Sequence, residues 1–186
     1  MSLTQALEKL VAVIESRGYA IRQYLQPGLS RDAIDSKVRH LGLHFPEEFY
    51  ELYQWHNGME LYQADCLIFG EHEFPPLEIA LAEHQELLKY YASTNINLFQ
   101  CFPIAMFNGS YHAVYCSDAL FYGLRNPIIE IFEGICIAFE NVGTMIDTAT
   151  EWYANGIYDE HSFDETRWRA IAKRFNSHIP DLSTSL

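Results

Sequence analysis

Four side chains in the first half of the sequence have the chemistry of metal ligands. They are His56, Glu71, His72 and Glu73, and imidazole and carboxylate groups bind zinc and similar ions. Their spacing matches no metal-binding motif, and His56 falls on the apolar side of a predicted helix. We therefore expect His56 to be a satisfied histidine at the edge of the core, residues 71–73 to form a solvated loop, and the chain to use no metal.

Cysteines are the second candidates, because a thiolate beside a histidine can act as a nucleophile. All four stand singly in apolar runs, without a CxxC pair: Cys66, Cys101, Cys116 and Cys136. Burial among apolar side chains raises the pKa of a thiol and suppresses its reactivity. We expect four buried, reduced thiols and no disulfide framework.

A pair of carboxylates is the third candidate. Glu130 and Glu133 are three residues apart, and paired carboxylates perform acid-base hydrolysis when burial separates their pKa values. In a short strand such residues more often point outward at an edge. The sequence also contains no dinucleotide-binding glycine pattern, phosphate-binding loop or serine-hydrolase elbow. A small hydrolase that uses acidic residues remains an alternative, whereas the main expectation is a protein that is not an enzyme and uses no cofactor.

The net charge of the chain indicates which classes of partner it can bind. With 25 acidic and 12 basic residues, the formal net charge is -13, whereas binding to a phosphate backbone depends on Lys and Arg. The most apolar stretch, residues 127–139, contains two glutamates and is shorter than a membrane span. Residues 1–19 predict a helix rather than a signal peptide. We expect a cytoplasmic protein that binds neither nucleic acid nor membranes, and whose negative field would attract a basic protein.

Periodic apolar residues predict the elements that position these side chains. Four helices are expected at residues 3–17, 30–41, 46–57 and 77–92. In the third, Pro46 fits the first helical position, Phe49 and Leu52 begin the buried face, and Asn57-Gly58 fits the end. Burial of this face should fasten the helix to the rest of the core.

Short β-branched and aromatic runs predict the sheet. Five runs are separated by turn residues and cover 64–69, 101–107, 111–116, 128–132 and 135–140. Glu133-Gly134 predicts a hairpin between the last two, with both faces of the sheet covered. Two more helices follow, one capped by Thr144 and one at residues 162–177 that begins with a Ser162–Glu165 capping box. The predicted fold is α+β: a mainly antiparallel sheet of about five strands, packed by helices, in one domain of residues 1–186 with an additional C-terminal helix.

The stretch LGLHFPEEFYELYQWHNG, residues 41–58, resembles the hallmark of the SUKH superfamily, which comprises SMI/KNR-like cell-wall regulators and bacterial immunity proteins. The matching residues are Leu41, Gly42, Pro46, Phe49, Leu52, Asn57 and Gly58. Residues 102–119, FPIAMFNGSYHAVYCSDA, are similar to a second family pattern that begins at Pro103. Phe45, Val38 and Ser110 depart from the residues usual at their positions. The resemblance covers about residues 30–156, with the first and last helices as additions.

The resemblance implies an α+β fold without catalytic residues that binds other proteins, either toxins in bacteria or signalling partners in fungi. The main interpretation is an immunity protein that occludes a toxin, and the alternative within the same fold is an intracellular scaffold or regulatory module. An acidic rim with aromatic anchors would suit a basic toxin domain. The partner-binding candidates are Glu47, Glu48, Glu51, Glu71, Glu73, Tyr158, Asp159 and Glu160. For each of them, a solvated helix face or a core ring is the competing interpretation.

Overall fold

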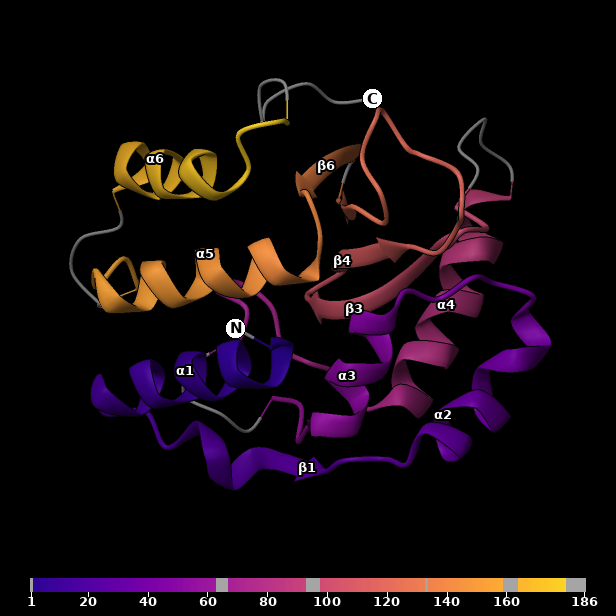
Figure 1. Cartoon of the computed structure of the whole chain (residues 1–186), viewed down its shortest axis with the longest axis horizontal. Helices are drawn as coiled ribbons and strands as arrows, with labels where there is room; N and C mark the ends of the chain where they lie inside the picture. Colours follow the sequence, from indigo (N-terminus) through magenta and orange to yellow (C-terminus); the bar gives the residue numbers. More distant parts are fainter. Residues whose placement is uncertain (1, 63–66, 93–97, 133, 159–163, 180–186) are drawn as a thin grey trace.

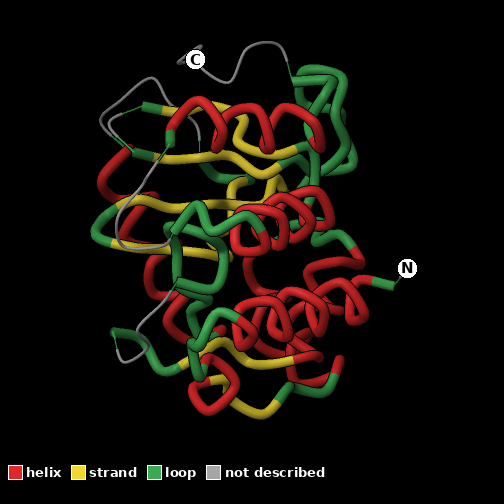
Figure 2. Tube along the Cα trace, turned by 90° about the vertical axis from the view of Figure 1, so that its left-hand side faces the viewer, coloured by secondary structure: helices red, strands yellow, loops and turns green. Residues whose placement is uncertain are grey.

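The computed structural model describes residues 2–62, 67–92, 98–132, 134–158 and 164–179 (Figure 1). Within these ranges, six α-helices and two antiparallel sheets form the α+β fold that the sequence predicts. The four-stranded sheet and the two-stranded sheet lie at opposite ends of the molecule (Figure 2). Among the described helices, none is both long enough and apolar enough to cross a bilayer.

The first two helices begin at the caps that the sequence predicts. Helix α1, Leu3–Ser16, starts with a capping box in which the Ser2 hydroxyl accepts the Gln5 N–H and the Gln5 side chain accepts the Ser2 N–H. Helix α2, Arg31–Val38, is capped by Ser30. A 3-10 turn, Arg39–Leu41, continues it and ends at Gly42, whose φ of +65° lies in the left-handed region.

Helix α3, Glu47–Trp55, buries the face that its spacing predicts. The side chains of Phe49, Leu52 and Tyr53 are fully buried. Pro46 is the N-cap residue rather than the first helical residue, because its ψ of 161° is extended. The Phe49 ring contacts Phe102 of the large sheet edge to face, at 5.5 Å between centroids. This contact fastens α3 to the sheet.

The predicted end of α3 at Asn57-Gly58 is wrong. The helix stops at Trp55, and strand β2, His56–Met59, pairs antiparallel with β1, Leu25–Pro27. His56 therefore belongs to a strand rather than to the apolar side of a helix. Its Nδ1 lies 2.6 Å from the Gln26 carbonyl, which makes it the satisfied, half-buried histidine that we expected. Pairing with β1 outweighed a local signal that is typical of a helix terminus.

Asn57 and Gly58 instead position the next helix. The Asn57 side-chain oxygen accepts the backbone N–H of Leu77 at 2.9 Å, at the start of α4, Leu77–Tyr91. This bond satisfies one of the amide groups that a helix leaves without an internal partner. Gly58 has a φ of +74°, and a Cβ atom there would lie 2.3 Å from the Pro76 nitrogen. Only glycine allows the two chain segments to approach this closely.

The large sheet is an antiparallel meander in the order β3-β4-β5-β6. Its strands are Cys101–Phe107, Ser110–Tyr115, Ile128–Ile131 and Ile135–Phe139. The expected strand at 64–69 is not a strand in its described part, because residues 67–69 enter a turn closed by the Phe69 N–H and the His72 carbonyl. Residues 64–66 lie outside the described ranges. Pro103 lies in the edge strand β3, where a residue without an N–H is tolerated.

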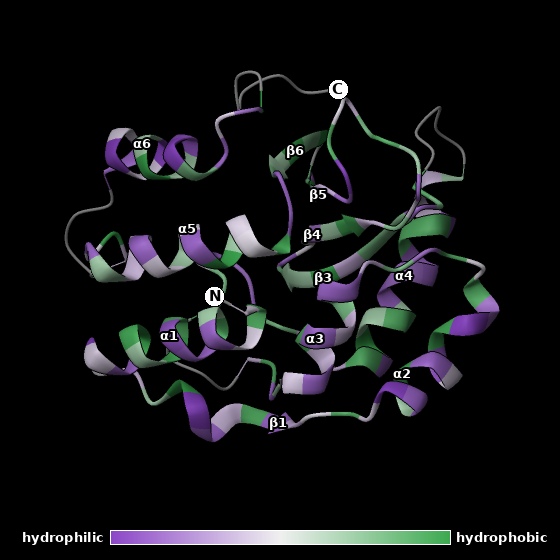
Figure 3. Cartoon of the chain, in the orientation of Figure 1, coloured by the Kyte–Doolittle hydropathy of each residue, from purple (hydrophilic) through white to green (hydrophobic). Residues whose placement is uncertain are grey.

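Both faces of the sheet are covered, as the apolar runs predict. Phe102, Val114 and Ile128 pack into a core shared with α1, α3 and a later helix, α5, Val142–Ala154. Ile129 and Ile131 join a second cluster that includes Leu87 of α4. Figure 3 shows the strands as mainly hydrophobic, while the helices alternate between hydrophobic and hydrophilic residues. The exception is Phe132, which follows β5 and is 54% exposed.

Two helices close the described chain. Helix α5, Val142–Ala154, is capped by Asn141, and the predicted cap Thr144 is instead the third helical residue that returns the capping-box bond. Helix α6, Glu165–Phe175, begins at the cap Asp164, while the predicted cap Ser162 lies outside the described residues. The rings of Trp152 and Trp168 stack at 4.9 Å and join α6 to α5.

Candidate partner-binding site

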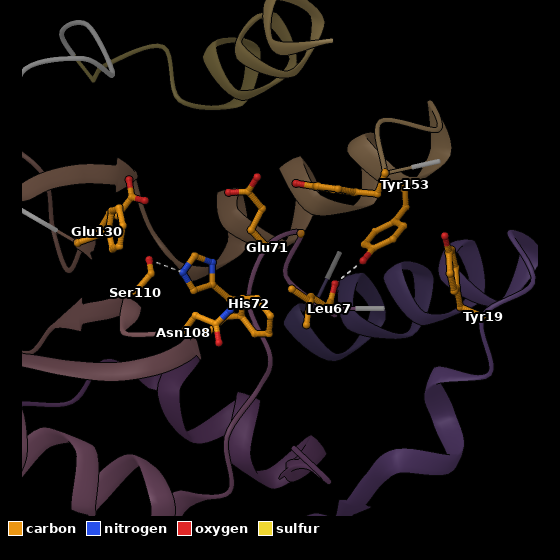
Figure 4. A pocket seen from close by; sticks show the side chains of 12 residues that line it. Tyr19, Leu67, Glu71, His72, Asn108, Ser110, Glu130 and Tyr153 are labelled. Atoms are coloured by element: carbon orange, nitrogen blue, oxygen red, sulfur yellow. Dashed lines mark hydrogen bonds between the residues drawn. The ribbon is translucent and has the colours of Figure 1, made fainter. Parts of the chain in front are cut away.

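A cavity of about 540 Å³ opens between the large sheet and the end of α5 (Figure 4). Its walls come from segments 67–72, 107–110, 130–132 and 153–158, together with Tyr19 of the chain after α1. Cavities of roughly 300–1,000 Å³ are the size that usually holds ligands or protruding side chains. A smaller hollow of about 160 Å³ shares Glu71, His72 and Glu130 with it. These three residues therefore lie where the two hollows adjoin.

Two turns bring these walls together. Gly70 has a φ of +77°, and a Cβ atom there would lie 2.5 Å from the Tyr158 hydroxyl and 3.0 Å from the Trp152 ring. The loop can therefore lie against α5 only with glycine at this position. Asn108 and Gly109 both have positive φ and form the two-residue turn between β3 and β4. This turn places Ser110 beside the loop.

Glu71 and Glu130 line the same cavity, and in the view of Figure 4 they lie to the right and to the left of the His72 ring. Partial burial of its carboxyl group, and then repulsion from Glu130, raise the pKa of Glu71. Neither carboxylate forms a salt bridge with any described residue; Glu130 accepts a weak bond from the Cys136 thiol at 3.4 Å. Among the described residues, Glu71 is the carboxylate whose pKa Glu130 raises; Glu133, the expected partner of Glu130, lies outside the described residues.

Two histidines form the buried floor. His72 is 3% exposed and its Nε2 lies 2.9 Å from the Ser110 hydroxyl. Its ring packs against that of His112 at 3.9 Å between centroids. Burial lowers the pKa of His72 to about 4 and lowers that of His112 well below its usual value. Both imidazoles are therefore neutral near neutral pH.

Residues 71–73 are not the solvated loop that we expected. Glu71 is exposed, but His72 and Glu73 are buried. Glu73 pairs through its backbone with Met106, and its Oε1 accepts the Tyr62 N–H. Burial raises the pKa of this carboxyl group. Because its side chain is only 1% exposed, the prediction that Glu73 belongs to an acidic rim is wrong.

The pKa values of the histidines predict a stability that falls in weak acid. Between about pH 6.5 and pH 4 the unfolded chain binds protons at His72 that the folded chain does not, so lowering the pH favours unfolding. His72 alone should cost about 2 kcal/mol of unfolding free energy between about pH 7 and about pH 5. The raised pKa values of Glu71 and Glu73 act in the opposite direction.

The His72→Gln variant isolates the contribution of this histidine, because glutamine keeps a polar group beside Ser110 and cannot titrate. Urea unfolding at both pH values should show a smaller pH dependence in the variant than in the wild type. Equal pH dependence in the two proteins would mean that His72 already binds its proton in the folded state.

The remaining candidates do not all gather at the cavity. Tyr158 lines it and accepts a hydrogen bond from the Trp168 indole at 3.2 Å. On α3, Glu47 is exposed and pairs with Arg31, whereas Glu48 and Glu51 are half-buried. None of these α3 glutamates lines the cavity. Asp159 and Glu160 lie outside the described residues.

The arrangement offers little catalytic chemistry. Ser110 and His72 have the spacing of a nucleophile and a base, but a histidine with a pKa of about 4 is a weak base near neutral pH. Its Nδ1 has no hydrogen-bond partner among the described residues, so nothing there orients the ring. Burial raises the pKa values of Cys101 and Cys136 to about 12 and that of Cys116 well above its usual value, while Cys66 is not described.

Metal binding also finds little support. The described residues contain no group of three or more His, Cys, Asp or Glu side chains placed to hold an ion. His56 and His72, the two histidines of the metal hypothesis, bond to the Gln26 carbonyl and to Ser110 respectively.

Sequence reasoning missed Ser110 and His112 as residues of this site, and it missed the proximity of Glu130 to Glu71. The Asn108-Gly109 turn could have indicated the position of Ser110, because a two-residue hairpin fixes which residues face each other across β3 and β4. His112 and Glu130 are cross-strand partners, a register that follows only once β4 and β5 are aligned. The position of the loop at 70–73 had no local signal.

Comparison with known families adds an independent observation. The model of the SMI1 / KNR4 family (SUKH-1) matches residues 28–155, a span that begins just after β1, runs from α2 through α5 and contains both quoted motifs. No curated protein sequence matches the chain significantly.

Proposed function

Because the chain belongs to the SMI1 / KNR4 family (SUKH-1), we propose that it is a non-enzymatic protein-binding module, and specifically an immunity protein that occludes the active site of a toxin. The family includes immunity proteins and related regulators, and its members typically bind protein toxins. The proposal therefore goes one step beyond the family, to the class of partner and the way in which it is neutralised.

One observation carries this proposal. The concave surface holds two carboxylates, Glu71 and Glu130, that form no salt bridge with the described residues. They belong to a chain of net charge -13. An acidic hollow with aromatic walls is complementary to a basic protein surface, and aromatic residues supply much of the binding energy at interfaces. The hallmark residues Phe49 and Leu52 are buried, so they support the fold and leave recognition to other side chains.

The experiment is capture of the partner followed by reconstitution. The tagged chain is incubated with lysate of its source cells, bound proteins are identified by mass spectrometry, and the complex is rebuilt from purified components. A toxin supports the immunity role, whereas a cellular signalling protein supports the regulatory role of the same fold. Failure to rebuild a complex with any captured protein would contradict both.

Association of the reconstituted complex should slow as salt is added. With a net charge of -13, steering of a basic partner should make the association rate fall roughly tenfold or more from low to high ionic strength. Stopped-flow measurements give this rate, and the dissociation rate of the same complex is the internal control because it should change much less. An association rate that does not depend on salt would contradict electrostatic steering of the partner.

A further inference from the structure

The cavity combines two kinds of wall. The carboxylates of Glu71 and Glu130 provide the acidic part, and rings such as Phe107, Phe132 and Tyr158 provide the aromatic part. No described residue that lines the larger cavity is lysine or arginine. Arg169 lines the smaller hollow, where its Nε and Nη2 donate to Oε1 of Glu165 at 2.9 and 2.8 Å.

A cation bound between the carboxylates of Glu71 and Glu130 would be stabilised by both of them. Glu71 and Glu130 are close enough for the charge of one to raise the pKa of the other, so their mutual repulsion is an unfavourable term that a positive group would remove. His72 does not supply that charge, because burial keeps its pKa at about 4 and the ring is neutral near neutral pH. The described residues that line the larger cavity therefore carry negative and neutral groups only.

The aromatic walls select the kind of cation. A guanidinium group is planar, stacks on aromatic rings and binds carboxylates through paired N–H donors, whereas an ammonium is a strongly hydrated point charge. Tyr158 lies against the Gly70 backbone, next to Glu71, and Phe132 follows Glu130 by two residues and is 54% exposed. Glu71 thus has the Tyr158 ring near it, and Glu130 has the Phe132 ring near it.

We propose that this cavity receives an arginine side chain of the protein partner, with the guanidinium held by Glu71 and Glu130 and flanked by Tyr158 and Phe132. This inference rests on the proposed protein-binding function and names the surface and the residue type that it uses. Glu130 is then a partner-binding residue, and Ser110 and Asn108 are neutral neighbours at the rim.

The probes are acetyl-arginine methylamide and its citrulline analogue, which has nearly the same shape and no charge. Each is titrated into the full chain and followed by amide chemical shifts in NMR spectra. The arginine probe should give saturable shifts at Gly70, Glu71 and Ser110 and bind about tenfold or more tightly than the citrulline probe. Equal affinities for the two probes would overturn the inference.

Three variants locate the binding group. Glu130→Gln and Glu71→Gln should each weaken the arginine probe about tenfold, whereas Glu86→Gln, on the exposed side of α4, should leave it unchanged. Arginine binding that is indifferent to both cavity substitutions would overturn the inference. A captured protein partner that binds these two variants as tightly as the wild type would also overturn it, and would leave the protein-binding function intact.

Discussion

Replacing Phe49 with alanine is expected to lower the free energy of unfolding by about 3–5 kcal/mol. The ring is fully buried and lies at the centre of an aromatic cluster, 4.2 Å from Phe45, 5.1 Å from Tyr53 and 5.5 Å from Phe102 between centroids. Alanine would leave a cavity where α3 meets the sheet. The lost contacts add to the lost burial, because a close-packed interior relaxes only in part.

Urea unfolding followed by circular dichroism measures this effect. Phe132→Ala is the matched control, because Phe132 is also a phenylalanine but is 54% exposed, and its replacement should change stability by about 0.5 kcal/mol or less. Similar midpoints for the two variants would show that α3 is not fastened to the sheet through Phe49.

Gly58→Ala is expected to lower the free energy of unfolding by about 2–4 kcal/mol. The left-handed φ of +74° costs a residue with a Cβ atom about 1 kcal/mol or more. In addition, that Cβ atom would lie 2.3 Å from the Pro76 nitrogen and 2.4 Å from the Pro75 carbonyl carbon. Backbone atoms cannot rotate away as a side chain can, so β2 and the start of α4 must separate, which adds about 1–3 kcal/mol.

Gly42→Ala separates the two contributions. Gly42 also has a positive φ, +65°, but a Cβ atom there would meet nothing within 4 Å. It should therefore lose only the conformational term of about 1–2 kcal/mol. Thermal unfolding of the two variants side by side gives the difference, and an equal loss of stability would exclude the close approach of Gly58 to Pro75-Pro76 as a cause.

Local sequence patterns predict the helices and strands of this fold better than the boundaries between them. The caps Ser2 and Ser30 and the buried face of α3 follow from spacing and side-chain chemistry, which act within a few residues. Asn57-Gly58 has the composition of a helix end, yet the helix stops at Trp55. The pairing of β2 with a strand about thirty residues earlier decides this boundary, and no local pattern contains that information.

The composition of the candidate site depends even more on contacts between residues that are far apart in the sequence. Glu71 and Tyr158 were predicted as partner-binding residues, and both line the cavity. Glu73 has the same charge as Glu71 but is buried, because strand-like pairing with Met106 turns it inward. The meeting of Glu71 with Glu130 requires the register of β4 and β5 and the turn at Gly70, which the sequence pattern could not supply.

A protein that neutralises its partner by covering a surface must act stoichiometrically, whereas an enzyme would act in catalytic amounts. The most direct measurement is therefore titration of the purified partner toxin's activity with the chain, followed by intact-mass analysis of the toxin. We predict complete inhibition at one molar equivalent, a toxin of unchanged mass, and recovery of toxin activity when the complex is separated. Complete inhibition by far less than one equivalent, with a changed toxin mass, would contradict a role based on binding alone.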